Sequence, residues 1–271
     1  MVKIDGLEIA AGIAEKLKKQ PVPKKFLAVF LVGQNPQSLA FIRQKKEFSE
    51  RLGVDFRLYE FPETIKNDEL RERVRQVVQA KPCGGALVQL PLPPHLNRHY
   101  ILNVIPREKD IDVLGERALG AFYTGRNPVL PPAVGVVQEI IKARGLTLGV
   151  LRAAVVGLGF LIGRPIASYL AAKTPELYLL DKGSDFKILK QADLVILGAG
   201  QAGLIRAQEL QEGAGVIDFG SSLEKNGKIQ GDFDSSGNTS HLSFYTPTPG
   251  GTGPILVAKL FENFYALNNN G

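Results

Sequence analysis

Short apolar runs alternate with amphipathic segments along this chain, and this alternation constrains the fold more than any other feature of the sequence. In the first half, residues 26–32, 54–59 and 85–89 have the composition of buried strands, and residues 35–52 and 67–80 between them have helical spacing. Parallel strands need a long crossover connection, usually a helix. The alternation therefore predicts a parallel sheet with crossover helices.

The second half repeats the alternation after a Pro-rich and turn-rich stretch, residues 90–127. With 44% hydrophobic residues, the 271-residue chain can bury the cores of two α/β domains. Beyond the elements above, we expect strands at residues 153–156, 177–180, 194–197 and 215–219, and helices at residues 2–19, 133–143, 161–172 and 255–265.

A glycine-rich loop follows the strand expected at residues 153–156. Gly157, Gly159 and Gly163 stand where a strand ends and a helix begins, and glycines there let a dinucleotide pyrophosphate approach backbone N–H groups. The spacing G-x-G-x-x-x-G is one residue longer than the usual fingerprint, so a plain tight turn is the alternative. Asp181 ends the next strand, where it can bind a ribose diol or cap a turn. The sequence leaves both roles open.

These patterns predict an α/β fold with two domains. An N-terminal α/β domain, which the resemblance described below makes the catalytic domain, comprises residues 1–122 and 252–271. A Rossmann-type dinucleotide-binding domain comprises residues 123–251. The C-terminal helix is expected to return to the first domain.

Charge and cysteine content exclude several classes of protein. The net charge of +6 comes from lysines and arginines interspersed with acids, so we expect no nucleic-acid partner. Apolar runs are far shorter than the roughly 20 residues that cross a membrane, and the lone Cys83, with no leader-like segment, indicates a cytoplasmic protein. His95, His99 and His241 are too dispersed for a metal site, so we expect no metal.

Four ordered blocks of sequence resemble one known enzyme family. Residues 33–45 contain Phe41 and Lys45, which are four apart and share a helix face; by spacing alone they are a core aromatic beside a surface lysine. The other blocks read V-Q-L-P-L-P at residues 88–93, K-D-I-D at 109–112 and T-P-T-P-G-G-T-G-P at 246–254. Together they are similar to the signatures of the bifunctional methylenetetrahydrofolate dehydrogenase/cyclohydrolase family.

This resemblance implies roles for individual residues. Lys45 corresponds to the catalytic lysine of the family, and Gln89 to the glutamine that positions that lysine. Asp112 corresponds to the carboxylate that hydrogen-bonds the pterin ring. The resemblance also implies that Phe41, which replaces a tyrosine, contacts the folate together with Pro249, Gly250 and Gly251.

The resemblance further implies an activity and its setting. Members oxidise 5,10-methylenetetrahydrofolate with NAD or NADP and hydrolyse 5,10-methenyltetrahydrofolate to 10-formyltetrahydrofolate, in one-carbon metabolism and purine biosynthesis. Members are homodimers. We therefore expect a small-molecule folate substrate, a nicotinamide dinucleotide and a homodimer.

The sequence departs from the family at several functional positions. Leu158 replaces an arginine that can bind a 2′-phosphate, and Asp181-Lys182 replaces a His-Ser pair, so we expect NAD to be favoured over NADP. Val113 replaces a glycine. Residues 130–135 keep only the glycine of P-C-T-P-x-G, and residues 200–202 read Gly-Gln-Ala instead of G-x-P.

These departures leave two alternatives open. One is a folate- or nucleotide-binding relative that has lost one or both activities. The other is a two-domain dehydrogenase of the shikimate or amino-acid dehydrogenase kind, although the V-Q-L-P-L-P and P-G-G-x-G-P blocks argue against it.

Overall fold

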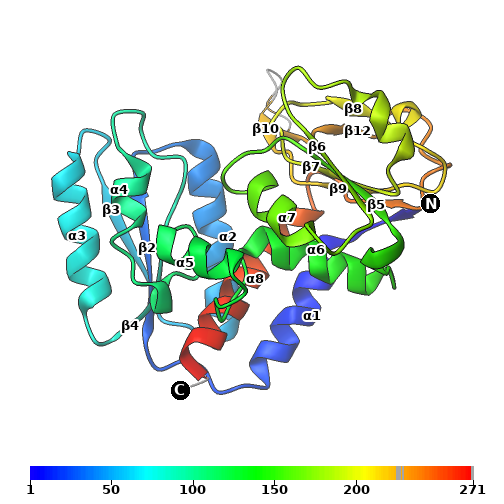
Figure 1. The fold of residues 1–271 in the computed structure, drawn as a ribbon. Coiled ribbons are helices and arrows are strands. Elements are labelled where there is room, and N and C mark those ends of the chain that lie inside the picture. The colour runs from blue at the N-terminus through cyan, green and yellow to red at the C-terminus, as the bar shows by residue number, and fades with distance from the viewer. Residues whose placement is uncertain (224–226, 228, 270–271) are drawn as a thin grey trace. The chain divides into compact units, whose positions relative to one another are not determined.

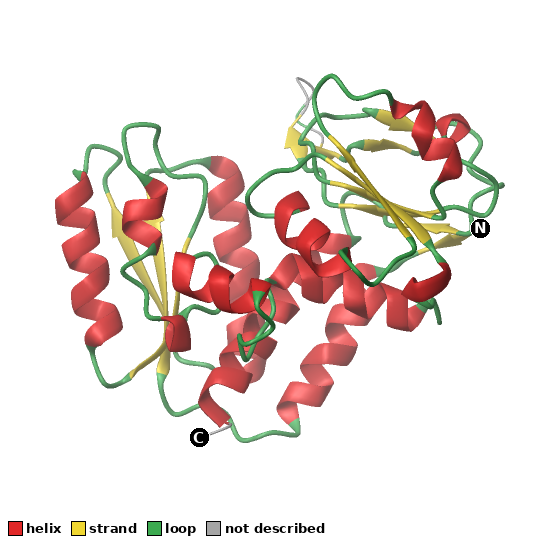
Figure 2. Cartoon of the chain, in the orientation of Figure 1, coloured by secondary structure: helices red, strands yellow, loops and turns green. Residues whose placement is uncertain are grey.

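The computed structural model describes residues 1–223, 227 and 229–269, so the last two residues of the expected first domain lie outside the described part. The chain divides into two compact units, which Figures 1 and 2 show. The small-sheet unit comprises Ala11–Pro132 and Val257–Gly271, and the large-sheet unit comprises Met1–Ala10 and Ala133–Leu256. No helix in the described part of the chain combines the length and apolar character that a membrane span requires.

The small-sheet unit is built on three parallel strands in the order β3-β2-β4. The central strand β2 (Phe26–Val32) is buried at every position, which explains its continuous apolar run. Helices α2 (Pro36–Leu52) and α3 (Asn67–Gln79) make the crossovers to β3 (Phe56–Phe61) and β4 (Cys83–Val88). Figure 1 shows α3 and α2 on opposite sides of this sheet. The predicted parallel sheet is confirmed.

Local signals in the sequence account for both ends of α2. The Asn35 side chain accepts hydrogen bonds from the backbone N–H groups of Gln37 and Ser38 at 3.0 and 3.1 Å, and Pro36 occupies the first turn. Gly53 ends the helix with φ +70°, a left-handed conformation that suits glycine. The predicted limits of this helix are confirmed.

The C-terminal helix α8 (Thr252–Asn269) packs into the small-sheet unit from Val257 onward. The rings of Phe261 and Phe48 of α2 lie 5.2 Å apart. A Cβ atom on Gly85 in β4 would lie 2.7 Å from the Phe264 ring, so the absence of a side chain there permits close packing. The predicted return of this helix is confirmed.

The large-sheet unit holds six parallel strands in the order β1-β13-β9-β7-β5-β6. From β5 the chain goes first to β6 on one side and then to β7 on the other. Such a reversal makes the carboxyl ends of β5 and β7 a topological switch point, where doubly wound sheets bind ligands. The strands are β1 (Val2–Lys3), β5 (Arg152–Val156), β6 (Glu176–Leu180), β7 (Leu194–Leu197), β9 (Gly215–Asp218) and β13 (Phe244–Tyr245).

The remaining strands of the described part are two residues long, and the remaining α-helices vary in length. They are β8 (Ile205–Arg206), β10 (Ser222–Leu223), β11 (Ile229–Gln230), β12 (Phe233–Asp234), α1 (Gly6–Lys18), α4 (Arg98–Leu102), α5 (Glu116–Tyr123), α6 (Pro132–Ala143) and α7 (Gly163–Leu170).

Two expectations about local structure were wrong. Residues 2–19 do not form one helix, because Val2 and Lys3 pair with Phe244 and Tyr245 of β13 before α1 begins. A two-residue strand has no periodicity, and its partner lies far away in sequence. The stretch 90–127 contains α4 and α5 rather than turns alone. The pairing of β1 also places residues 1–10 in the large-sheet unit, whereas the sequence grouped them with the first domain.

Gly85→Ala should destabilise the protein by about 1–3 kcal/mol. The new methyl carbon would lie only 2.7 Å from the Phe264 ring and 2.8 Å from the Ile111 side chain, and both distances are too short for carbon atoms. Gly120→Ala in α5 is the matched control. It has open space around it and should stabilise the protein by up to about 1 kcal/mol through helix propensity. Urea unfolding measures both, and equal stability of the two variants would contradict the packing argument.

Candidate functional site

The small-sheet unit buries a lysine against an amide oxygen. Lys45 lies on α2 with 6% of its surface exposed, and its Nζ donates a hydrogen bond to Oε1 of Gln89 at 2.7 Å. Gln89 follows β4 directly. Its backbone N–H donates a hydrogen bond to the Phe30 carbonyl at 2.8 Å, and its Nε2 donates one to the Leu90 carbonyl at 2.7 Å. These two bonds fix the amide, so that its oxygen faces the lysine.

The electrostatics of Lys45 suit proton transfer. Burial lowers the pKa of Lys45 to about 8, and the Asp112 carboxylate acts in the opposite direction. Burial raises the pKa of Asp112, which the Lys45 ammonium in turn lowers. The two groups are therefore electrostatically coupled. An amine that titrates near pH 8 can both accept and donate a proton close to neutrality.

The expected folate-site residues of this unit fall into one cluster. Lys45, Gln89 and Asp112 come together from α2, from the end of β4 and from the turn after Lys109. Phe41 lies one helical turn before Lys45 on α2 and is partly buried. Ser38, another turn earlier, has a buried hydroxyl without a hydrogen-bond partner. No motif in the sequence singles out this serine.

The glycine-rich loop of the large-sheet unit packs against the loop that follows β7. Gly157 has φ +87°, and a Cβ atom there would lie 2.5 Å from the backbone of Ala199. A Cβ on Gly163 would overlap the Gly157 carbonyl oxygen, so α7 starts in close contact with the end of β5. Gly159 has open space around it. Two glycines thus serve packing, and Gly159 leaves the backbone accessible to a ligand.

Two buried carboxylates shape this loop region, and the sequence motifs did not indicate either. Asp232 accepts hydrogen bonds from the backbone N–H groups of residues 199–201, at 2.6, 3.0 and 2.7 Å. Asp218, at the end of β9, accepts from the N–H groups of Gly220, Asp232 and Phe233. Burial raises the pKa of Asp218 to about 7. The only signal in the sequence is that Asp218 closes an apolar strand.

Asp181 lies exposed after β6. Its carboxylate accepts a hydrogen bond from the N–H of Lys182 at 2.9 Å, as in a turn. The Arg164 Nε donates to the Leu158 carbonyl at 3.0 Å, so this guanidinium folds over the glycine-rich loop. Binding of ribose by Asp181 stays a prediction.

The expected P-G-G loop belongs to the large-sheet unit and precedes α8. Gly250 has φ +94° and its carbonyl accepts the N–H of Gly6 at 2.9 Å. A Cβ on Gly6 would overlap the Gly251 carbonyl oxygen, so the start of α1 lies tightly against this loop. Pro249 is exposed. The Thr252 hydroxyl donates to the Asp218 carbonyl at 2.8 Å, which ties the loop to β9.

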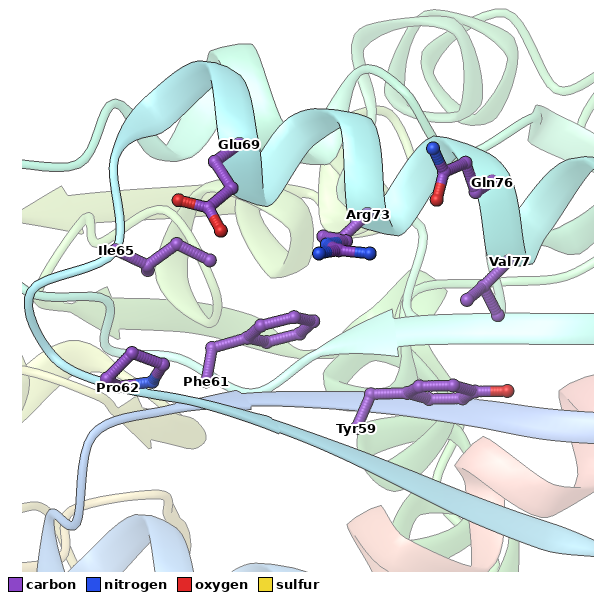
Figure 3. Close-up of a pocket in the computed structure, with 8 residues that line it drawn as sticks. All are labelled: Tyr59, Phe61, Pro62, Ile65, Glu69, Arg73, Gln76 and Val77. Carbon is purple, nitrogen blue, oxygen red and sulfur yellow. The ribbon is translucent and has the colours of Figure 1, made fainter.

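A separate hollow of about 350 Å³ lies between β3 and α3. Figure 3 shows aromatic rings of β3 facing polar side chains of the helix across it. None of the expected site residues lines this hollow. In the described part of the chain, no group of three or more His, Cys, Asp or Glu side chains could hold a metal ion. The lining residues are Tyr59, Phe61, Pro62, Ile65, Glu69, Arg73, Gln76 and Val77.

The fold and these sites define a class of protein. A parallel sheet with a glycine-rich loop at its switch point, joined to a second unit with a buried lysine of lowered pKa, is typical of a two-domain dinucleotide-dependent α/β enzyme. Comparisons with known proteins narrow the class. Residues 4–112 match the catalytic domain of the tetrahydrofolate dehydrogenase/cyclohydrolase family, and residues 131–270 match its NAD(P)-binding domain.

Individual relatives agree with this match. The chain is 35% identical to the bifunctional protein FolD of Bacillus licheniformis over 269 residues, which cover 96% of this chain and 94% of the relative. The bifunctional enzyme FolD of Campylobacter jejuni has a TM-score of 0.93 at 32% identity, with 98% of each chain covered. The Trypanosoma brucei FolD, complexed with NADP cofactor and inhibitor, has a TM-score of 0.92 at 26% identity, with 99% and 97% covered. The chain belongs to the tetrahydrofolate dehydrogenase/cyclohydrolase family.

The buried lysine should make stability depend on pH. The pKa of Lys45 is about 8 in the folded protein and 10.5 in an exposed lysine, so the unfolded state binds more protons between these values. The free energy of unfolding of the wild type should therefore rise with pH through this window, relative to Lys45→Met, by up to about 3 kcal/mol. Urea unfolding of both proteins at several pH values measures the difference. If the free energies of unfolding of the two proteins changed in parallel with pH, the pKa of Lys45 would not be lowered.

Proposed function

We propose that this protein oxidises 5,10-methylenetetrahydrofolate, with a nicotinamide dinucleotide as hydride acceptor, and hydrolyses 5,10-methenyltetrahydrofolate to 10-formyltetrahydrofolate. The observation that carries the proposal is the buried hydrogen bond between Lys45 and Gln89 beside Asp112, in a chain of this family. All three residues fall on family motif positions. The V-Q-L-P-L-P block and the match of both halves of the chain to the family argue against a shikimate-type dehydrogenase.

The two steps demand different things of the protein. When bound, the dinucleotide supplies the hydride acceptor for the first step, so the protein mainly positions the folate. In the second step, water adds to the cationic methenyl carbon and loses a proton, which leaves a hydroxyl on this carbon. The bond from the carbon to N5 then breaks as N5 gains a proton, and the hydroxyl proton passes to the solvent as the formyl group forms. Lys45 can take the first proton and give the second, since its pKa of about 8 permits both. Gln89 holds the amine in place, and Asp112 binds the pterin ring.

Lys45→Met should abolish the hydrolysis, with a loss of at least about 100-fold, because general acid–base catalysis contributes on this scale. The fold should survive, since methionine fills a similar volume without burying a charge. Absorbance of methenyltetrahydrofolate measures the rate. Lys46→Met is the matched control, because Lys46 is exposed on another face of α2. Near-normal hydrolysis by Lys45→Met would remove this lysine from the mechanism.

The large-sheet unit offers a dinucleotide site that fits NAD better than NADP. The backbone at Gly159 is accessible, as a pyrophosphate requires. Leu158 cannot pair with a 2′-phosphate, and the Asp181 carboxylate can accept hydrogen bonds from ribose hydroxyls but would repel a phosphate. The Trypanosoma brucei relative was solved with NADP, so a preference for NAD rests on the residues of this chain and not on family membership. We therefore assign NAD as the favoured cofactor on these two residues.

NAD should bind this protein more tightly than NADP, by about tenfold or more, because a 2′-phosphate would lie near a carboxylate without an arginine. Asp181→Asn should reduce the difference in affinity between NAD and NADP, because it removes the negative charge that repels the 2′-phosphate. Dissociation constants from calorimetry at low and high salt measure both effects. Tighter binding of NADP that weakens as salt rises would mean that Lys182 or Arg164 binds the phosphate, and that Asp181 has no such role.

We also propose that the protein acts in the cytoplasm as a homodimer, without a nucleic-acid partner. The basis for the dimer and the location is family membership, and the basis for the last point is the interspersed charge of the chain. The mass of the protein in solution tests the dimer.

A further inference from the structure

The turn that carries Asp112 contains a strained residue. Val113 has φ +56°, in the left-handed region that β-branched residues rarely adopt. Its side chain is fully buried and packs with Ala118 and Val129. The family motif has glycine at this position, and glycine adopts such a conformation without strain. In this chain, other contacts must hold the turn in shape.

The Asp110 carboxylate supplies such contacts. Its Oδ2 accepts hydrogen bonds from the N–H groups of Leu114 and Gly115, at 3.0 and 2.8 Å. Asp110 is only 2% exposed, so water does not compete for these bonds. A Cβ on Gly115 would lie 3.2 Å from Oδ2, and glycine therefore allows this close approach. Burial and the nearby Asp112 carboxylate raise the pKa of Asp110 to about 7, while the backbone N–H groups of Gly115, Leu114 and Val113 act to lower it.

The backbone on the other side of Asp112 is anchored separately. Asp110 pairs with Ala86 of β4 through an isolated bridge, and the Ile111 carbonyl accepts a hydrogen bond from Nδ2 of Asn263 at 2.8 Å. The turn is thus fixed before Asp112 by β4 and α8. After Asp112, it is held by the Asp110 carboxylate through Leu114 and Gly115. Asp112 projects from between these two anchors.

We infer that Asp110 is a positioning residue, whose hydrogen bonds hold Val113 in its left-handed conformation and so direct the Asp112 carboxylate toward the folate and Lys45. Asp110 itself touches neither folate nor dinucleotide in this role. The inference rests on the proposed function, in which Asp112 binds the pterin ring.

Asp110→Asn, compared with the wild type above the Asp110 pKa of about 7, tests the inference, because the charged carboxylate is then replaced by a neutral amide of the same shape. The KM for methylenetetrahydrofolate should rise about tenfold or more, as expected for the loss of charge-assisted hydrogen bonds. The KM for the dinucleotide should stay unchanged. Asp55→Asn, an exposed acid of the same unit, is the matched control and should change neither KM. A folded Asp110→Asn protein with an unchanged folate KM would overturn the inference.

Val113→Gly in the Asp110→Asn background separates positioning from general stability. Glycine adopts the left-handed conformation without help, so the double variant should recover most of the folate KM, even though it loses a buried side chain. The same recovery would support the inference if Asp110→Asn alone fails to fold. A folded double variant with the KM still raised would overturn it, as would a double variant that remains unfolded.

The failure of this inference can be told apart from failure of the proposed function. If the wild-type protein did not turn over methylenetetrahydrofolate, the proposed function would be contradicted. In that case, the dissociation constant of tetrahydrofolate itself, measured by calorimetry for the same variants, decides the role of Asp110. The constant should rise in Asp110→Asn and recover with Val113→Gly, and an unchanged constant in all variants would overturn the inference.

Discussion

The site in the small-sheet unit depends on the burial of one amine against one amide oxygen. A charged lysine is costly to bury, and a single neutral acceptor does not offset that cost, so its pKa falls. The hydrogen bond joins α2, which carries Lys45, to Gln89 at the end of β4, and the Asp112 carboxylate interacts electrostatically with the amine from the turn after Lys109. The same geometry that lowers the stability at neutral pH prepares the amine for proton transfer.

Buried carboxylates shape the loops in both units. Asp110 binds two backbone N–H groups, and Asp218 and Asp232 bind three each. Loops at the carboxyl ends of parallel strands have no ladder partners for these N–H groups, and a buried acceptor satisfies them while holding the loop in one conformation. Functional backbone is therefore kept rigid without regular secondary structure.

Three of the departures from the family motif lie close to the proposed binding sites. Phe41 stands one turn from Lys45, and Val113 directly follows Asp112. Leu158 lies in the glycine-rich loop, between the packed Gly157 and the accessible Gly159. Gly85 and Gly163 belong to the framework, where a side chain at either position would overlap neighbouring atoms. These differences can thus alter binding while the fold is retained.

The sequence alone determined the alternating elements and the limits of α2, because periodicity and caps are local signals. It singled out Lys45, Gln89 and Asp112 only through short contiguous blocks that resemble family motifs. Only the tertiary structure decided the pairing of β1 with β13, the burial of Lys45 and the hydrogen bonds of Asp110, Asp218 and Asp232. Such features join residues that are distant in sequence, or depend on how fully neighbouring elements exclude water. An aspartate in a loop looks the same in sequence whether solvent or backbone N–H groups surround it, and packing alone distinguishes the two.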